Sequence, residues 1–271
     1  MSGVGQAGWA INLTLAAVLS AGCAVADEPA ATVTPSAGTP VPSSPMAASP
    51  TPMAPPPAIG ANPTIGEVPE DQWAKIVATG TWRPGCPVGR GQLRRIEVNH
   101  YDFDGEIQRG VLVAHSDTAQ DLADIFTEMF EAGFPITRIV PAEEYAGDVQ
   151  RSLEADATSA FNCRRPGQIN APVLLSPHAS GRAIDINPYR NPWLDLRCDC
   201  WQPSADYATT RTGPGVISLG SLPWRLFTDH GWVWQNIKVP DYMHFDTGYP
   251  SRPVQRPTAS GSEPLTSPGG Q

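Results

Sequence analysis

The chain has 271 residues and a formal net charge of −9 at pH 7, from 18 Lys and Arg against 27 Asp and Glu. An acidic chain of this kind lacks the basic surface that phosphate backbones require, so we expect no nucleic-acid partner. The length allows one or two domains, but long stretches rich in Pro and small residues reduce the foldable part to one.

Residues 1–22 are predicted to be a signal peptide. Their apolar stretch is too short for a typical transmembrane helix, and it runs into Leu19–Cys23 (LSAGC), which resembles a bacterial lipobox. Two usual features are missing, since Ser20 stands where a lipobox has Leu and no Lys or Arg precedes Lys75. We expect an extracytoplasmic protein, either anchored to the cell membrane through lipidated Cys23 or secreted.

The segments on either side of the predicted domain have a low-complexity composition. Residues 23–64 are dominated by Pro, Ala, Ser and Thr and cannot bury enough apolar surface to offset the entropy of ordering, so we expect a disordered linker. The Pro-, Gly- and Ser-rich tail 253–271 is predicted to be disordered too. Residues 65–252 remain as one domain, long enough to bury a core of its own.

The first elements predicted in this domain are a β-hairpin and a helix. Residues 93–101 and 107–115 read as paired strands around the turn Asp102–Gly105 (DFDG). Ser116 or Asp117 then caps a helix whose apolar residues recur at helical spacing, namely Leu122, Ile125, Phe126, Met129 and Phe130. Gly133 and Pro135 end this helix.

Later in the domain the pattern predicts a short strand over 136–140, strands over 183–186 and 242–246, and a helix over 222–227. Hairpins and helices are segregated along the chain rather than strictly alternating. This order is typical of an α+β domain with an antiparallel sheet and flanking helices.

Two short segments carry the residues of a candidate metal site. Ser176–Asp185 (SPHASGRAID) contains His178 and Asp185, and Asp241–His244 (DYMH) follows about sixty residues later. Catalytic zinc takes three protein ligands, usually His with a carboxylate, and leaves a fourth position for water. We therefore predict that His178, Asp185 and His244 bind Zn²⁺ and that Asp241 is a general base beside it, which describes a hydrolase.

The local pattern around these residues supports the prediction. In the strand that contains Asp185, Ile184 and Ile186 share one face and the carboxylate lies on the other, directed to a cleft or the surface. Gly181 can take the positive φ that a reversal towards His178 requires. Pro240 indicates that Asp241 lies in the bend before the strand of His244.

At these residues the sequence resembles the zinc D-alanyl-D-alanine carboxypeptidases of the VanY type. The first segment matches their SxHxxGxAxD motif, and DYMHF matches their second motif, in which an acidic residue stands three positions before the last His. The family also contains D-Ala-D-Ala dipeptidases and L-alanyl-D-glutamate endopeptidases, and it shares its fold with the hedgehog signalling domain. Further matches bring the resemblance to roughly residues 85–246; they are Ser159–Arg164, Ile184–Pro188 with Asn191–Pro192, and Gly231–Trp234.

The resemblance implies a role for each matching residue. His178, Asp185 and His244 correspond to the zinc ligands, Asp241 to the catalytic base, and Arg164 to the arginine that stabilises the oxyanion. Among the candidates for substrate binding, Ser176 matches a serine of the dipeptidase branch. Arg182 is a nearby cation for a substrate carboxylate.

The four cysteines after Cys23 are expected to form disulfides, because their number is even and the protein is expected to be exported. The family's recurring cysteines suggest that Cys86 pairs with Cys163. Cys198 and Cys200 would then close a strained ring across one residue, so a cross pairing stays open.

We therefore expect a monomeric zinc peptidase with a hedgehog-like fold that acts on peptidoglycan stem peptides, most directly as a D-alanyl-D-alanine carboxypeptidase. The alternatives are an L-alanyl-D-glutamate-type endopeptidase or a non-catalytic zinc-binding module of the cell wall. Relatives usually continue GWxW with two glycines and another tryptophan, whereas this chain reads Gln235–Val239 (QNIKV), which affects the choice of substrate. The remaining histidines, His100, His115 and His230, have no adjoining acidic motif and are expected to be surface or core residues.

Overall fold

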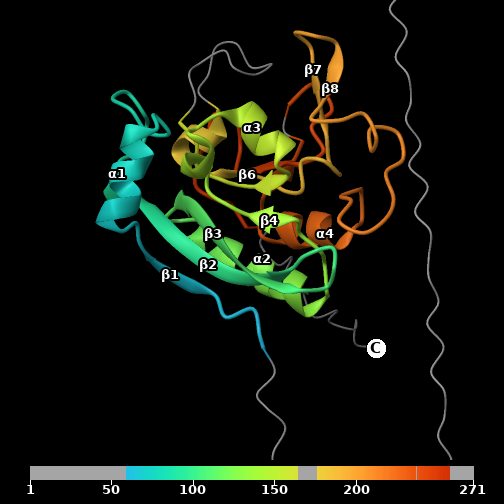
Figure 1. The fold of residues 1–271 in the computed structure, drawn as a ribbon, viewed down its shortest axis with the longest axis horizontal. Coiled ribbons are helices and arrows are strands. Elements are labelled where there is room, and N and C mark those ends of the chain that lie inside the picture. The colour runs from blue at the N-terminus through green and yellow to red at the C-terminus, as the bar shows by residue number, and fades with distance from the viewer. Residues whose placement is uncertain (1–58, 164–175, 236, 257–271) are drawn as a thin grey trace, which may run out of the picture. The chain divides into compact units, whose positions relative to one another are not determined.

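The computed structural model of the chain describes residues 59–163, 176–235 and 237–256 (Figure 1). The predicted signal peptide, Cys23 and nearly all of the predicted linker lie outside the described residues. Within those ranges, none of the helices has the length and apolar character needed to cross a bilayer.

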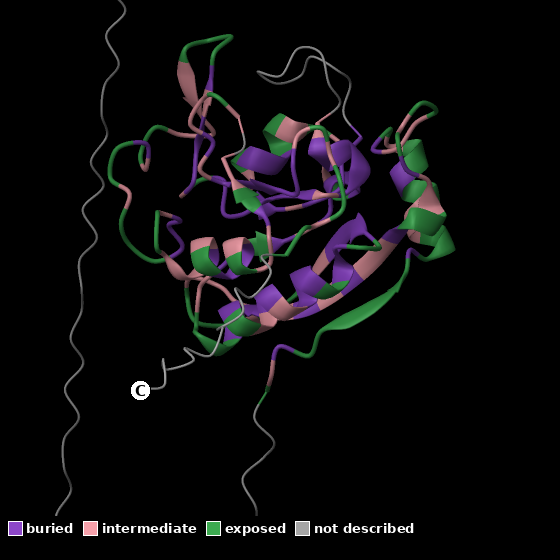
Figure 2. Cartoon of the chain, turned by 180° about the vertical axis from the view of Figure 1, so that it is seen from behind, coloured by how far each residue is buried: buried purple, intermediate pink, exposed green. Residues whose placement is uncertain are grey.

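A three-stranded antiparallel sheet in the order β1–β2–β3 forms one side of the domain, from β1 (Thr64–Glu67), β2 (Leu93–Tyr101) and β3 (Ile107–His115). The predicted hairpin is confirmed, with Leu93 opposite His115 and Tyr101 opposite Ile107. The Asp102 carboxylate fixes the turn between the two strands by accepting hydrogen bonds from the amides of Asp104 and Glu106. Every residue of the edge strand β1 is exposed (Figure 2).

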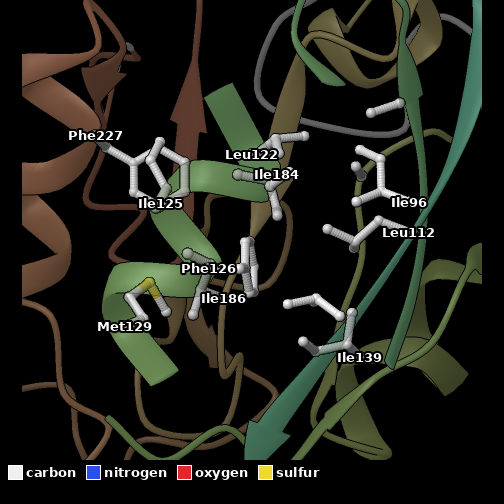
Figure 3. Packing of buried hydrophobic residues seen from close by; sticks show 14 of the residues in the cluster. Ile96, Leu112, Leu122, Ile125, Phe126, Met129, Ile139, Ile184, Ile186 and Phe227 are labelled. Carbon is white, nitrogen blue, oxygen red and sulfur yellow. The ribbon is translucent and has the colours of Figure 1, made fainter. Parts of the chain in front are cut away.

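The main core lies where this sheet meets α2 (Ala119–Glu131). The apolar residues of α2 predicted at helical spacing are buried, and they pack against Ile96 and Leu112 of the sheet (Figure 3). Ile184, Ile186 and Phe227 belong to the same cluster, and in Figure 3 Phe227 lies beside Ile125. The segment that contains Asp185 is thus fixed by the core of the domain.

A second antiparallel sheet, in the order β6–β10–β9, contains two of the three candidate metal ligands, Asp185 and His244, and the third, His178, lies in a turn just before β6. Its strands are β6 (Ala183–Asp185), β10 (His244–Asp246) and β9 (Val233–Trp234), and α4 (Leu222–Asp229) packs beside it. The Phe245 and Phe227 rings stack with centroids 4.2 Å apart, which joins the sheet to this helix.

A smaller apolar cluster joins α1 (Glu70–Ala78) to the first sheet through Ile76, Leu93 and Val113. Cys86 lies against this cluster and is bonded to Cys163 within it. Cys198 is bonded to Cys200, so the cross pairing of the four cysteines is not adopted.

The remaining elements are short. The only parallel pair among the described strands joins β4 to β5, and β7 and β8 form an antiparallel hairpin. The bounds are β4 Arg138–Ile139, β5 Ala157–Thr158, β7 Trp193–Asp195, β8 Cys200–Gln202, α3 Val149–Glu154, and the 3₁₀ turns η1 Arg90–Gln92, η2 Ala142–Tyr145 and η3 Pro177–Ser180. Mixed helices and antiparallel strands confirm the α+β class, although the strands form several small sheets rather than one.

Packing contacts extend beyond residues 65 and 252, the ends of the domain that were predicted from the sequence. Before residue 65, Ala61 is buried and its carbonyl accepts a hydrogen bond from the Asn99 amide at 2.7 Å. After residue 252, Val254 packs against the main core and Arg256 pairs with Asp121. Both flanks therefore contribute contacts to the domain.

Candidate metal centre

His178, Asp185 and His244 meet at one buried point. The Nε2 atom of His178 lies 3.2 Å from Oδ1 of Asp185 and 3.2 Å from Nδ1 of His244, and the last two atoms are 3.1 Å apart. Two atoms bound to one tetrahedral zinc at about 2.0–2.1 Å lie roughly 3.4 Å from each other. The triangle of donor atoms therefore has the size that a zinc ion needs.

The position of His178 is set by a short turn and the glycine that ends it. The Ser176 hydroxyl caps η3 by accepting a hydrogen bond from the His178 amide at 3.4 Å. Gly181 has φ +69° at the end of the turn, as the sequence predicted. A Cβ there would lie 2.7 Å from the backbone nitrogen of His115, so the chain can reverse towards Asp185 only with a glycine.

Asp185 and His244 are direct partners across β6 and β10. Their neighbours Ile184 and Phe245 also face each other and are fully buried in the main core. Because side chains alternate along a strand, core packing of the apolar pair directs the carboxylate and the imidazole to the opposite face. Asp185 was expected to face a cleft or the surface, and it is only 8% exposed.

The second nitrogen of each imidazole has its own partner. Nδ1 of His178 lies 2.6 Å from the carbonyl oxygen of Ala160, and Nε2 of His244 lies 3.1 Å from Oδ2 of Asp246. Both partners are acceptors, so each of these ring nitrogens donates a proton to its partner. The nitrogens that face each other then carry lone pairs. Together with the Asp185 carboxylate they form a site for a cation.

The electrostatics of Asp185 and His244 agree with this conclusion. Burial alone would raise the pKa of Asp185, but His178 and His244 outweigh it and hold that pKa well below its ordinary value of 3.8. Burial alone would lower the pKa of His244, but hydrogen bonds to Asp185 and Asp246 and the charge of Asp241 raise it well above 6.5. Both shifts show that positive charge is favoured at this point of the structure.

Asp241 lies at the edge of the same centre. It precedes a tight turn in which its carbonyl accepts a hydrogen bond from the His244 amide at 3.3 Å, so the bend predicted after Pro240 is present. Its backbone forms a β-bridge with Trp193, and its amide donates to Oε1 of Gln235 at 3.3 Å. The side chain is 8% exposed, and its charge acts on His244. Asp241 is thus a second buried carboxylate whose charge acts on one of the candidate ligands.

The other predicted site residues are located differently. Arg164 lies outside the described residues. Arg182 directs its guanidinium to Asp117, with Nη2 2.8 Å from Oδ2, and it also contacts His115. Ser176 is used as the cap of η3, so both of these side chains already have contacts within the domain.

Some residues of the site were not predicted from the sequence. Asp246 lies within the strand predicted over 242–246, but no role was predicted for it, although side chains two positions apart on a strand share a face. No sequence pattern predicts that β7 pairs with the segment that contains Asp241. Elsewhere in the domain, His115 pairs with Asp117 two positions further along the chain, and His230 pairs with Asp121, which is distant in the sequence.

Comparison with known families identifies the class of this site. The family model of D-alanyl-D-alanine carboxypeptidase matches residues 170–247, a segment that includes all three candidate ligands and Asp241. The family resemblance predicted from the two motifs is confirmed for this segment by the match. Peptidases of this family are generally metal-dependent, in agreement with the His-Asp-His group. No curated protein matches the chain, and no solved structure matches it either.

Proposed function

We propose that the protein is a zinc-dependent peptidoglycan peptidase, acting most directly as a D-alanyl-D-alanine carboxypeptidase. The observation that carries the proposal is the triangle of lone pairs from His178, Asp185 and His244, in which every edge is 3.1–3.2 Å. Borderline nitrogen ligands with one carboxylate suit zinc, and three protein ligands leave a position open for catalysis. The family match over the same residues supports the reaction class. We also propose that the domain has a hedgehog-type fold, as the family resemblance implies.

In this mechanism the zinc ion would lower the pKa of water and polarise the scissile carbonyl. The chain's own residues supply the proton transfers and the positioning. Asp241 accepts the proton of the attacking water and then donates it to the leaving amine. The backbone contacts of Asp241 with Trp193 and Gln235 would hold the carboxylate in place for both steps. The resemblance assigns stabilisation of the oxyanion to Arg164.

The bond that is cut depends on the shape of the cleft around Asp241. A carboxypeptidase must hold the free carboxylate of its substrate, for which Ser176 and Arg182 are the candidates that we propose. An endopeptidase needs a cleft open at both ends, and the residues that replace the usual glycines and tryptophan include Gln235, which contacts the Asp241 amide. L-alanyl-D-glutamate endopeptidase activity is therefore the second candidate.

Mass spectrometry of defined muropeptides separates the two activities. The zinc-loaded protein should remove the mass of one alanine from a pentapeptide stem. Release of the intact fragment from D-glutamate onward would instead assign it to the endopeptidases. If neither product forms although zinc is bound, the catalytic proposal is wrong and a non-catalytic wall-binding module is favoured.

We further propose that the peptidase acts outside the cytoplasm, tethered to the membrane through a lipid on Cys23 or secreted to the cell wall, as a monomer. The lipobox-like LSAGC and the Pro-rich segment that follows it support this location. In a bacterial host, Cys23→Ser should release the protein to the medium. Wild-type protein that is already entirely soluble and carries no lipid would contradict the anchor.

A further inference from the structure

Asp246 lies directly behind the imidazole of His244. Its side chain is fully buried, with 0% exposure, and its Oδ2 atom is 3.1 Å from Nε2 of His244. The other oxygen, Oδ1, accepts a hydrogen bond from the Gly248 amide at 2.7 Å. The carboxylate is therefore held from one side by the backbone and faces the histidine with the other.

The direction of this contact fixes which nitrogen of His244 carries a proton. A carboxylate only accepts hydrogen bonds, so Nε2 is the donor. In the neutral ring the lone pair must then be on Nδ1, the atom 3.1 Å from Asp185 and 3.2 Å from His178. His178 has the opposite arrangement, since its Nδ1 donates to the Ala160 carbonyl and its Nε2 faces the centre.

Asp246 is separated from the metal position by the width of the ring. The group of residues whose donor atoms come together contains His178, Asp185 and His244 but not Asp246. Asp246 thus contacts the centre through the imidazole of His244. A neutral carbonyl orients His178, whereas a full negative charge orients His244, so the two ligands are not equivalent.

We propose that Asp246 is a positioning residue that holds His244 in the tautomer with a free Nδ1 and makes that nitrogen a stronger metal ligand. The inference rests on the metal site of the proposed function. A carboxylate behind a ligating imidazole fixes the ring and raises its basicity, and loss of such a partner typically weakens metal binding about 10- to 100-fold.

The test is the zinc dissociation constant of purified protein, measured by competition with a chromophoric chelator at several pH values. Asp246→Asn keeps the size of the side chain but removes the charge, and its amide can also donate to Nε2 and favour the wrong tautomer. We expect zinc affinity to fall about 10- to 100-fold. A folded Asp246→Asn variant that binds zinc within twofold of the wild type would overturn the proposal.

Asp121→Asn is the matched control. Asp121 is also a buried carboxylate in contact with a histidine, 3.2 Å from Nδ1 of His230, but it belongs to another part of the domain. Its substitution should leave zinc affinity unchanged even if it lowers stability. If the wild type itself binds no zinc, the proposed metal site fails; if the wild type binds zinc and Asp246→Asn binds equally well, only the role of Asp246 fails.

A second measurement needs no variant. In zinc-loaded wild-type protein labelled with ¹⁵N-histidine, the NMR spectrum should show His244 bound through Nδ1 with a proton on Nε2, and His178 with the two nitrogens exchanged. Finding His244 bound through Nε2 would contradict the proposal even if Asp246→Asn does not fold.

Discussion

Asp185 and His244 are direct partners in the antiparallel pairing of β6 with β10, and Oδ1 of one lies 3.1 Å from Nδ1 of the other. The register of these two short strands therefore brings two of the three candidate metal ligands together. A shift of the strand register by one residue would turn Ile184 or Phe245 toward the site. It would turn Asp185 or His244 toward the apolar core. Burial of Ile184 and Phe245 in the main core opposes that shift, so core packing and site geometry depend on each other.

Gly181→Ala should damage both the fold and the metal centre. A non-glycine residue in the left-handed region costs about 1–2 kcal/mol, and the new Cβ would also lie 2.7 Å from the His115 backbone nitrogen. Gly220→Ala is the control, because Gly220 has a similar φ of +77° but no atom within 4 Å of the position that the new methyl group would take. Thermal unfolding and zinc affinity should both fall more in Gly181→Ala. Equal losses in the two variants would show that the close approach to His115 is unimportant.

Asp241→Asn should keep the zinc and lose turnover, because the amide cannot accept the proton from water. General-base catalysis is worth about a hundred- to ten-thousandfold in rate. Muropeptide turnover and zinc content are measured together, and Asp121→Asn serves as a buried-acid control that should remain active. Near-normal turnover in Asp241→Asn, or loss of its zinc, would contradict the assigned role.

The two disulfides should contribute unequally to stability. Cys86 and Cys163 close a loop with a sequence separation of 77, whereas Cys198 and Cys200 are separated by 2. In the chain-entropy model the first bond stabilises by about 4 kcal/mol and the second by about 1 kcal/mol. Denaturant unfolding of the two double Cys→Ala variants tests this difference. A larger loss from the Cys198 and Cys200 pair would contradict the expectation.

Glu143 gives a prediction for the pH dependence of stability. It is 1% exposed, and within the described residues its Oε1 accepts a hydrogen bond from Gln72 while its Oε2 has no hydrogen-bond partner. Burial raises the pKa of this carboxyl above its ordinary value of 4.5. The stability that it contributes is fully present below pH 4.5 and is lost as the pH rises through the higher folded-state pKa.

Glu143→Gln removes this titration. The free energy of unfolding of the variant, relative to the wild type, should therefore increase between pH 4.5 and neutral pH. Glu144→Gln is the comparison, since it removes a half-exposed ion pair with Lys75 and only a minor cause of the raised Glu143 pKa; it is expected to change stability little and to leave most of the pH dependence in place. A difference between Glu143→Gln and the wild type that does not vary with pH would argue against the raised pKa.

The sequence was sufficient where a local pattern carried the information. The alternation in 93–101 and 107–115 predicted the hairpin with its observed bounds, and the helical spacing from Leu122 to Phe130 predicted α2. Gly181 was predicted to have a positive φ because a reversal was needed between two motif residues. These are features in which each residue and its near neighbours determine the structure.

Other features depend on contacts between distant segments and could not be predicted in this way. The strands β7 and β8 are only three residues long, too short for a clear alternation. The bridge of Trp193 to Asp241 joins segments that are distant in the sequence, so no local pattern predicts it. The helix α1 begins after Pro69 with no side-chain cap, so its first turn has no capping signal. Asp246 could have been proposed as a partner of His244 from strand periodicity alone.

The central claim is that His178, Asp185 and His244 hold one zinc ion, and elemental analysis of purified variants tests it most directly. Wild-type protein should contain one tightly bound zinc per chain. His178→Ala and His244→Ala, each confirmed as folded by circular dichroism, should contain none, because each removes one of three ligands from the centre. Retention of one tightly bound zinc per chain in either folded variant would contradict the account.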